Sequence, residues 1–260
     1  MDLGGEDGHN RHASQEERRA VEPRHRVPQM GQAVPLLSII IPTRNAATTL
    51  PATVATVTSD NAPDDAEIVV VDGGSADGTM AVARRLGATV IDSEPGRGRQ
   101  LSCGAGAAAG DWLLFLHADT RLDRGWREAV RDFIDVPANA GRAAYFSYAL
   151  DDTAWLARRL EAIVRWRSRA LGLPYGDQGL LISRAFYDDI GGFRPLVLME
   201  DVDIVRRIGR RRLTMLDCRA VTSAARYKAS GYLPRALRNV MCLSLYFLGV
   251  PPRMIARIYG

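Results

Sequence analysis

The residues most able to do chemistry in this chain stand directly after runs of apolar residues. His117 and Asp119 follow the apolar run Trp112–Leu116, and Asp72 follows the second run, Glu67–Val71. A carboxylate in such a place can hold a hard cation, and the cation can hold a phosphate. The carboxylate of Asp72 can accept hydrogen bonds from a base or a ribose. An Asp directly after a strand has no evident capping role, so a ligand-binding role is worth considering. The alternative is that Asp119 starts a turn or caps the next helix, and spacing alone leaves the two about equally open.

Histidine is scarce where the chain is expected to fold. Three of the four histidines lie in the polar stretch Met1–Ala33, which we expect to be a disordered extension. His117 is therefore the only histidine of the folded body, and it stands two residues before Asp119. That coincidence modestly favours a site.

A second group of acids, Glu200, Asp201 and Asp203, begins a helical pattern that runs from Asp201 to Arg212 and ends in arginines. The helix dipole favours that order by itself, so helix-end electrostatics is the plain alternative for these acids. Asp201 could be held near the amides at the start of the helix. Asp203 lies about 200° around the helix from Asp201, so the two carboxylates cannot serve one site equally.

Buried strands that alternate with helices must position these side chains. We expect strands at Leu36–Ile41, Glu67–Val71, Ala88–Ile91 and Trp112–Leu116, and later at Ala143–Tyr148 and Leu180–Ser183. The unbroken apolar character of Trp112–Leu116 suits a strand buried on both faces of a parallel sheet. The expected helices are Thr48–Thr58, a helix ending at Leu86, part of Gly96–Gly110, Arg124–Ile134 and Ala154–Leu171. Because ligands of open α/β sheets bind at the carboxyl ends of the strands, the site is expected there.

A glycine-rich segment, Gly104–Ala109, spells GxGxxA. A dinucleotide fingerprint must follow a strand and open a helix, whereas this match precedes a strand. We therefore interpret it as small residues that pack a helix tightly on the sheet.

The composition narrows the class of protein. The 260 residues suffice for one large α/β domain or two small ones, and the net charge of +4 is mild. No stripe of alternating basic and aromatic residues is present, so we expect no nucleic-acid partner. The three cysteines form no CxxC pair, which indicates neither a disulfide framework nor a structural zinc site. Since Met1–Ala33 has no apolar core of a secretory signal, we expect a cytoplasmic protein.

The last segment, Tyr232–Gly260, is expected to form two helices separated by Pro251 and Pro252. Its apolar part, Val240–Val250, is too short to cross a bilayer, which needs about 20 residues. Arginines flank it on both sides. It is either a core helix or a helix at a membrane surface, which would place the protein at the inner face of the cell membrane.

Six motifs together resemble the family 2 glycosyltransferases, which are inverting enzymes of the GT-A fold. The motifs are PTRN (42–45), VDGGSADGT (71–79), HADT (117–120), GDQG (176–179), GGF (191–193) and MEDVD (199–203). The finer pattern resembles a bacterial branch of small enzymes named for genomic association with radical-SAM and selenium-related proteins. The resemblance covers about Leu36 to Arg226. It implies an α/β fold in which helices sandwich a Rossmann-like mixed sheet, with a GT-A domain at 34–230 and a C-terminal helical segment at 231–260.

The resemblance also implies roles for the donor side of a site. The residues implied to bind the nucleotide are Pro42, Thr43, Arg44, Asp72, Gly73, Arg99, His117 and Asp119. Asp119 matches the last acid of the family's DxD motif and would ligate Mg²⁺ or Mn²⁺ on the diphosphate. His117 stands where the motif has its first Asp, and an imidazole suits Mn²⁺ better than Mg²⁺.

On the acceptor side, the resemblance implies that Asp201 is the general base, with Glu200 as its rival. The residues implied for an acceptor or diphosphate loop are Gly176, Asp177, Gln178, Arg226 and Tyr227. The expected partners are a UDP- or GDP-sugar donor and an acceptor of unknown identity.

Two other classes of nucleotide-sugar-handling protein stay open. A sugar-phosphate nucleotidyltransferase usually has a glycine-rich basic loop after its first strand, but Pro42–Asn45 contains no glycine. A non-catalytic binding module is weakly disfavoured by the presence of both Asp119 and Asp201.

Overall fold

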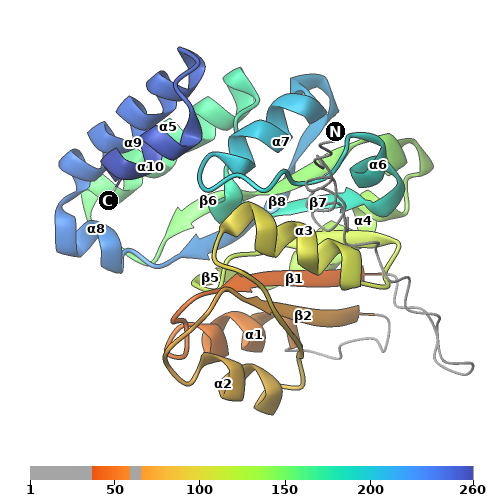
Figure 1. Cartoon of the computed structure of the whole chain (residues 1–260). Coiled ribbons are helices and arrows are strands. Elements are labelled where there is room, and N and C mark those ends of the chain that lie inside the picture. The colour runs from red at the N-terminus through yellow and green to blue at the C-terminus, as the bar shows by residue number, and fades with distance from the viewer. Residues whose placement is uncertain (1–36, 59–65, 260) are drawn as a thin grey trace, which may run out of the picture.

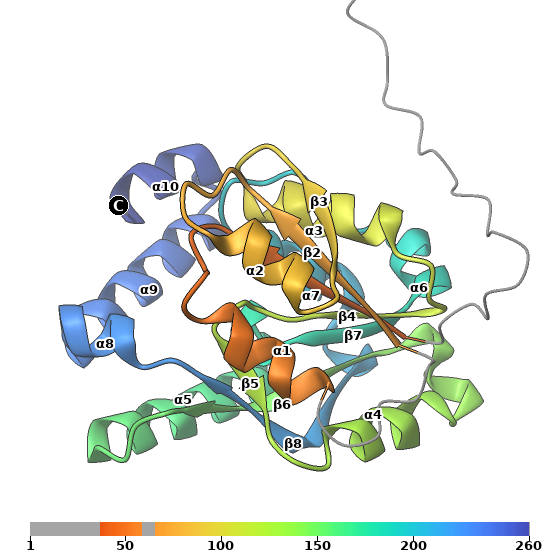
Figure 2. The ribbon, with the colours of Figure 1, turned by 90° about the horizontal axis from the view of Figure 1, so that it is seen from below.

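The computed structural model describes residues 37–58 and 66–259, apart from the side chains of Arg226 and Tyr259. The extension expected at Met1–Ala33 lies outside these residues. Within them, eight strands form one sheet in the order β3-β2-β1-β4-β7-β6-β8-β5. Helices flank the sheet on both faces, as Figures 1 and 2 show, so the expected sandwich with a mixed sheet is confirmed.

One half of the sheet is parallel. It contains β1 (Leu37–Thr43), β2 (Ala66–Asp72), β3 (Thr89–Asp92) and β4 (Trp112–Phe115). Helices α1 (Leu50–Thr58) and α2 (Thr79–Arg85) cover one face, and α3 (Arg97–Ala107) covers the other (Figure 1). Helices cover both faces because the strands are apolar on both sides. In β1, Ile39 and Ile41 pack with α1, while Ile40 packs with α3.

The other half of the sheet is mixed. β7 (Leu180–Ser183) runs antiparallel to β4 and to β6 (Ala143–Leu150), while β8 (Leu213–Thr222) is parallel to β6 and antiparallel to β5 (Thr120–Leu122). β4 is buried along its whole length, as predicted, but only one of its two neighbours is parallel. β4 is therefore the buried strand that the apolar run predicts, and it lies where the mixed sheet changes from parallel to antiparallel pairing.

The remaining helices surround this second half. They are α4 (Trp126–Ile134), α5 (Trp155–Leu171), α6 (Arg184–Asp189), α7 (Glu200–Ile208), α8 (Ala225–Ser230), α9 (Tyr232–Phe247) and α10 (Pro252–Tyr259), with short 3₁₀ turns η1 (Pro137–Gly141), η2 (Gly176–Gln178) and η3 (Arg210–Arg212). The helix expected from Asp201 to Arg212 ends early, because Gly209 takes a left-handed φ of 81° and the arginines after it form η3. The two helices expected after Gly231 are confirmed.

The glycine-rich segment packs α3 against the sheet, as predicted. A Cβ on Gly104 would lie 2.5 Å from Cγ2 of Ile40, so no larger residue fits without a shift of β1 or α3. This close packing brings the start of α3 to the carboxyl ends of β1 and β2.

Candidate functional site

A cleft with a cavity volume of about 180 Å³, partly open to solvent, lies where the two halves of the sheet meet. Its walls come from the carboxyl end of β4, the turn η2, the start of α7 and the helices α8 and α9. The polar and charged residues that line it include Arg97, His117, Asp119, Tyr175, Asp177, Glu200, Asp201, Tyr227 and Asn239. The structure thus brings together most of the acids and the histidine that the sequence singled out.

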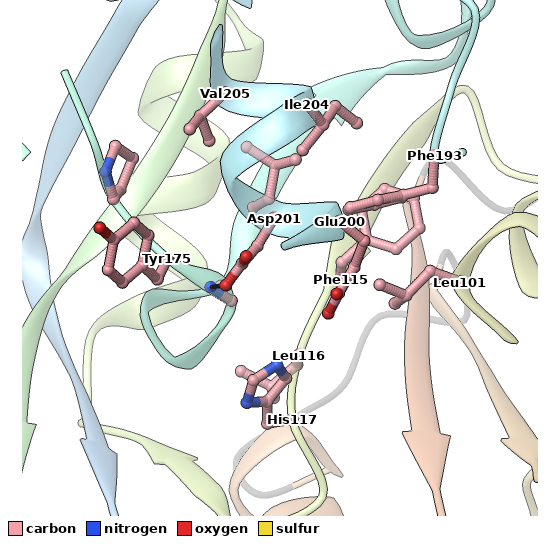
Figure 3. A pocket seen from close by; sticks show the side chains of 14 residues that line it. Leu101, Phe115, Leu116, His117, Tyr175, Phe193, Glu200, Asp201, Ile204 and Val205 are labelled. Carbon is pink, nitrogen blue, oxygen red and sulfur yellow. Dashed lines mark hydrogen bonds between the residues drawn. The ribbon is translucent and has the colours of Figure 1, made fainter. Parts of the chain in front are cut away.

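Asp201 is held rigidly at the first turn of α7. Its Oδ1 accepts a hydrogen bond of 2.8 Å from the amide of Val202, and its Oδ2 accepts one of 3.1 Å from the amide of Gly176. The predicted position beside the amides at the start of the helix is confirmed. In Figure 3 the carboxylate of Asp201 and the ring of His117 point toward the same part of the pocket. Two backbone donors fix the Asp201 carboxylate without neutralising it.

The ring of His117 lies directly against η2. A Cβ on Gly176 would lie 2.5 Å from Nε2 of His117, so only glycine allows this approach. The same glycine donates to Asp201. Gly176 therefore joins the end of β4 to the start of α7.

Glu200 occupies a different environment from its neighbour. Its carboxyl is buried beside the apolar side chains of Leu101, Phe115 and Phe193, and its charged partner is Arg97, with Nη1 3.6 Å from Oε1 (Figure 3). Burial, followed by the negative charge of Asp201, raises the pKa of Glu200 to about 7. Near neutral pH a large share of Glu200 is therefore protonated.

Asp203 is a structural residue. Its carboxylate is paired with Arg194 at 3.1 Å and with Arg207 at 2.6 Å. Arg207 also donates to the carbonyls of Ile190 and Gly192. Asp203 therefore fastens α7 to the GGF loop, and the prediction that it is not the base fits this role.

Several buried polar atoms of the cleft have no hydrogen-bond partner among the described residues. They include the hydroxyl of Tyr175, Oδ1 of Asp177 and Oδ1 of Asn239. Burial raises the pKa of Asp177 to about 6, opposed by the charge of Arg167. An unpaired buried polar atom costs about 1–3 kcal/mol, so these atoms are suited to a polar ligand that enters the cleft.

Gln178 does not line the cleft. Its Oε1 accepts from the hydroxyl of Ser168 at 2.9 Å, and its Nε2 donates to the carbonyl of Phe146 at 3.1 Å. The residue is fully buried, so the sequence-based place for it in an acceptor or diphosphate loop was wrong. It anchors η2 to β6 and α5 instead.

Asp119 lies in a turn held from both sides. The carbonyl of Ala118 accepts from the hydroxyl of Thr53, and the carbonyl of Asp119 accepts from the amide of Ser223. In residues 37–58 and 66–259, no three side chains of His, Cys, Asp or Glu come together as a complete metal site. Mg²⁺ is commonly held by one or two carboxylates plus substrate phosphates, and Asp119 beside His117 fits such a partial donor set.

The loops after β1 and β2 lie at the same edge of the sheet but outside the residues that line the cleft. Asp72 is fully buried and accepts hydrogen bonds from the hydroxyl of Thr43 (3.0 Å) and from the amide and hydroxyl of Ser75 (2.8 and 2.6 Å). The interpretation that Asp72 has no capping role was wrong, because Asp72 accepts the amide of Ser75, but its implied part in nucleotide binding stays a prediction. Gln100, which the sequence analysis missed, donates to the carbonyls of Thr43 and Val71 and lies where a Cβ on Gly73 would go.

Of the remaining predicted residues, some line the cleft and others lie outside it. Pro42 is half-buried and Arg44 is exposed in the β1 loop, and Tyr227 lines the cleft, where its ring stacks on that of Tyr232. Arg99 pairs with Glu94 and lines a separate depression, so it does not join the other site residues. Arg97, two residues earlier, enters the cleft in its place. The side chain of Arg226 lies outside the described part.

Comparisons with known proteins agree on the family. A family model described as "Glycosyl transferase family 2" matches residues 38–191. A PGL/p-HBAD biosynthesis glycosyltransferase of Mycobacterium bovis is 41% identical over 97 residues, which are 35% of this chain and 38% of that protein. An uncharacterized glycosyltransferase of the same species is 28% identical over 134 residues, or 51% of this chain and 59% of that protein. Both matches thus span less than two thirds of these relatives.

Solved structures share the fold. A mannosyltransferase of Pyrobaculum calidifontis, in complex with GDP-Man and Mn²⁺, has a TM-score of 0.62 at 20% identity and covers 81% of this chain and 61% of its own. The first 349 residues of TarS from S. aureus have a TM-score of 0.61 at 17% identity, and the match covers 86% of this chain and 69% of that chain. The finer likeness to the radical-SAM-associated branch stays a prediction. The match of the family model over more than half of the chain, on a GT-A fold, shows that this chain belongs to glycosyl transferase family 2.

Proposed function

We propose that the protein is an inverting glycosyltransferase that moves a sugar from a nucleoside-diphosphate sugar to an acceptor hydroxyl. The observation that carries the proposal is the placement of Asp201. Its carboxylate is fixed by the amides of Val202 and Gly176 inside a cleft that Asp119 also lines. A carboxylate fixed in this way can act as a base while the other wall of the cleft binds the donor.

The reaction is an in-line displacement at the anomeric carbon. The acceptor oxygen forms a bond to that carbon, its proton passes to Oδ2 or Oδ1 of Asp201, and the nucleoside diphosphate leaves with the bonding electron pair. Glu200 is less suited to this task than Asp201, because its buried carboxyl is partly protonated near neutral pH.

The diphosphate gains negative charge as it leaves. Arg97, Arg167 and Arg235 all line the cleft and can stabilise that charge. Asp119, with His117 beside it, would hold a divalent cation, which supplies further positive charge to the diphosphate. Solved proteins of the same fold carry Mn²⁺ with GDP-Man, or Mn²⁺ or Mg²⁺ with UDP, and this supports a cation and a UDP- or GDP-sugar here.

The acceptor side of the cleft is polar. The unpaired atoms of Tyr175, Asp177 and Asn239 can each bond a hydroxyl group. This supports an acceptor with several hydroxyl groups close to the reacting one. The two other classes, a nucleotidyltransferase and a non-catalytic binding module, have no specific observation in their favour.

Release of nucleotide from a panel of UDP- and GDP-sugars tests the proposal. We expect release of UDP or GDP with Mn²⁺ or Mg²⁺, its loss in EDTA, and its recovery when metal is added back. Asp119→Asn keeps the shape but loses the charge that binds the metal, so it should lose most of the activity. Arg131→Gln on α4, an exposed position outside the cleft, is the control. Full turnover in EDTA, or in Asp119→Asn, would contradict the metal-assisted reaction.

A nucleotidyltransferase would instead release pyrophosphate from a nucleoside triphosphate and a sugar phosphate. A binding module would bind the donor, and raise the melting temperature, without releasing nucleotide. The same assays therefore separate the three classes.

A further inference from the structure

Three helices, α5 and the consecutive pair α9 and α10, lie at the side of the molecule away from α1 and α2 in Figure 1. In Figure 2, α10 lies beside α9, and α5 lies apart from both, beyond α8. α5 packs on β6, the start of α9 shares a small core cluster with α5, and α10 packs on α9. Each helix therefore has one buried face and one face toward solvent.

The outer face of α5 is apolar where a surface helix is usually polar. The buried residues of this helix include Ala157 and Val164. Trp155 and Trp166 each stand two residues from one of these, about 200° around the helix, and are 65% and 63% exposed. Ile163 is exposed beside them. Two tryptophans held in water on one helix face are unusual, because each leaves a large apolar surface unburied.

α9 shows the same arrangement. Cys242 is its buried residue, and Val240 lies about 200° from it on the opposite side. Leu233 and Leu237 continue the exposed apolar face with Val240, at 68%, 61% and 61% exposure. The inner face of α9 lines the cleft through Arg235, Asn239, Cys242 and Leu243.

The exposed charges on α5, α9 and α10 themselves are all positive, although the exposed Asp151 and the half-buried Asp152 lie just before α5. The segment from Tyr232 to the end of the chain contains no Asp or Glu. The one acid of α5, Glu161, is buried and paired with Arg158. The exposed arginines of the three helices are Arg158, Arg159, Arg165 and Arg169 on α5 and Arg253 and Arg257 on α10. Of these, Arg253 also lines the depression that Glu94 and Arg99 line. On α10, Arg253 and Arg257 both lie opposite the buried Ile255.

We propose that this side, which we call the α5–α9–α10 face, binds the surface of an anionic lipid bilayer. Tryptophan favours the depth of the lipid headgroups, leucine and valine enter the acyl boundary, and arginine pairs with anionic headgroups. A second copy of the chain fits the face poorly, since it would bring arginines against arginines. No helix in the described part of the chain is long and apolar enough to cross a membrane, so the contact is a surface contact. Because α9 separates this face from the cleft, the cleft then opens beside the lipid surface.

Sedimentation of the full chain with lipid vesicles tests this proposal without any assay of activity. Vesicles of phosphatidylcholine alone are compared with vesicles that also contain phosphatidylglycerol, at low and at high salt. We expect the chain to pellet with the anionic vesicles at low salt, and more weakly at high salt or with neutral lipid. The double variant Trp166→Asp/Leu237→Asp should lose at least about tenfold in lipid affinity, since two apolar anchors are replaced by charges that repel the headgroups.

Val136→Asp is the matched control, because Val136 is also an exposed apolar residue but precedes η1, beside α4 on another side of the molecule (Figure 2). It should keep the lipid affinity. Quenching of tryptophan fluorescence by brominated lipid needs no variant, because Trp112 and Trp126 are buried and only the two tryptophans of α5 can meet the lipid. The proposal is wrong if the chain stays in solution with anionic vesicles at low salt, if brominated lipid quenches nothing, or if Val136→Asp loses as much affinity as the double variant. A dimer in solution that the double variant dissociates would also overturn it, in favour of a second copy.

Discussion

At the scale of single residues, the site depends on two adjacent carboxylates in unlike surroundings. Asp201 meets two backbone amides at the edge of the cleft, whereas Glu200 is buried against Leu101, Phe115 and Phe193. Hydrogen-bond donors stabilise a carboxylate, and burial favours its protonated form. The sequence shows two equal acids side by side, and only their surroundings make them different.

The raised pKa of Glu200 predicts a dependence of stability on pH. The folded state favours the protonated acid, so this residue's contribution is fully present below its ordinary pKa near 4.5 and is lost as the pH rises through about 7. Glu200→Gln cannot ionise. Its unfolding free energy relative to wild type should therefore increase between pH 5 and pH 8, by on the order of 3 kcal/mol at most.

Thermal or urea unfolding at the two pH values measures this difference. Glu128→Gln, at an exposed acid of α4, is the matched control and should show no such change. An equal effect of Glu200→Gln at pH 5 and pH 8 would mean that the carboxyl is ionised in the folded protein throughout.

Residue types, with the position after a strand for His117 and Asp119 and at a helix start for Asp201, were sufficient to select three residues that line the cleft. Asp72, Gln178 and Arg99, which the resemblance also implied as site residues, do not line it. A hydrogen bond from Ser75 to Asp72, or from Gln178 to Phe146, depends on loop geometry that no spacing reveals. Arg97 and Arg99 differ only in which side of α3 they occupy, so their order in the sequence could not show which one enters the cleft.

At the scale of elements, the turn η2 connects the two walls of the site, the loop after β4 and the start of α7. Gly176 leaves no room for a Cβ beside the ring of His117 in the β4 loop, and its amide donates to Asp201 of α7. A methyl group at this position would meet Nε2 of His117 at 2.5 Å, and either the ring or the turn must move.

Gly176→Ala should therefore lower the turnover number about tenfold or more, because small displacements of catalytic groups cost large factors in rate. Gly106→Ala is the control, since a Cβ on Gly106 of α3 meets no atom within 4 Å and alanine favours helix. Steady-state rates and melting temperatures of both variants are compared. Wild-type turnover in Gly176→Ala would show that the close packing at Gly176 has no part in catalysis.

Periodicity predicted most elements, but β5, β8, α6 and α8 were missed. β5, α6 and α8 are short, and a strand of three residues or a helix of six carries too little pattern. β8 did carry a signal, because Leu216, Cys218 and Ala220 alternate with exposed residues along it. That alternation was the missed evidence for the longest strand of the sheet.

At the scale of the whole molecule, the cleft lies at the change from parallel to antiparallel pairing between β4 and β7. The parallel half supplies His117 and Asp119, and the mixed half supplies η2 and α7. Strand order depends on pairings between distant segments, so the local pattern that marks β4 as buried could not reveal its antiparallel neighbour. The division into residues 34–230 and 231–260 stays a prediction, although Leu243 and Tyr246 of α9 pack against the main core.

The central claim is that Asp201 is the base, and the pair Asp201→Asn and Glu200→Gln tests it most directly. Turnover of the donor sugar and its dissociation constant are measured for both variants and for wild type. We predict near-normal donor binding in both, and a loss of about a hundredfold or more in turnover for Asp201→Asn alone. Helix-end electrostatics would instead change stability by a few tenths of a kcal/mol and leave the rate intact. Wild-type turnover by Asp201→Asn, or a larger loss in Glu200→Gln, would contradict the account.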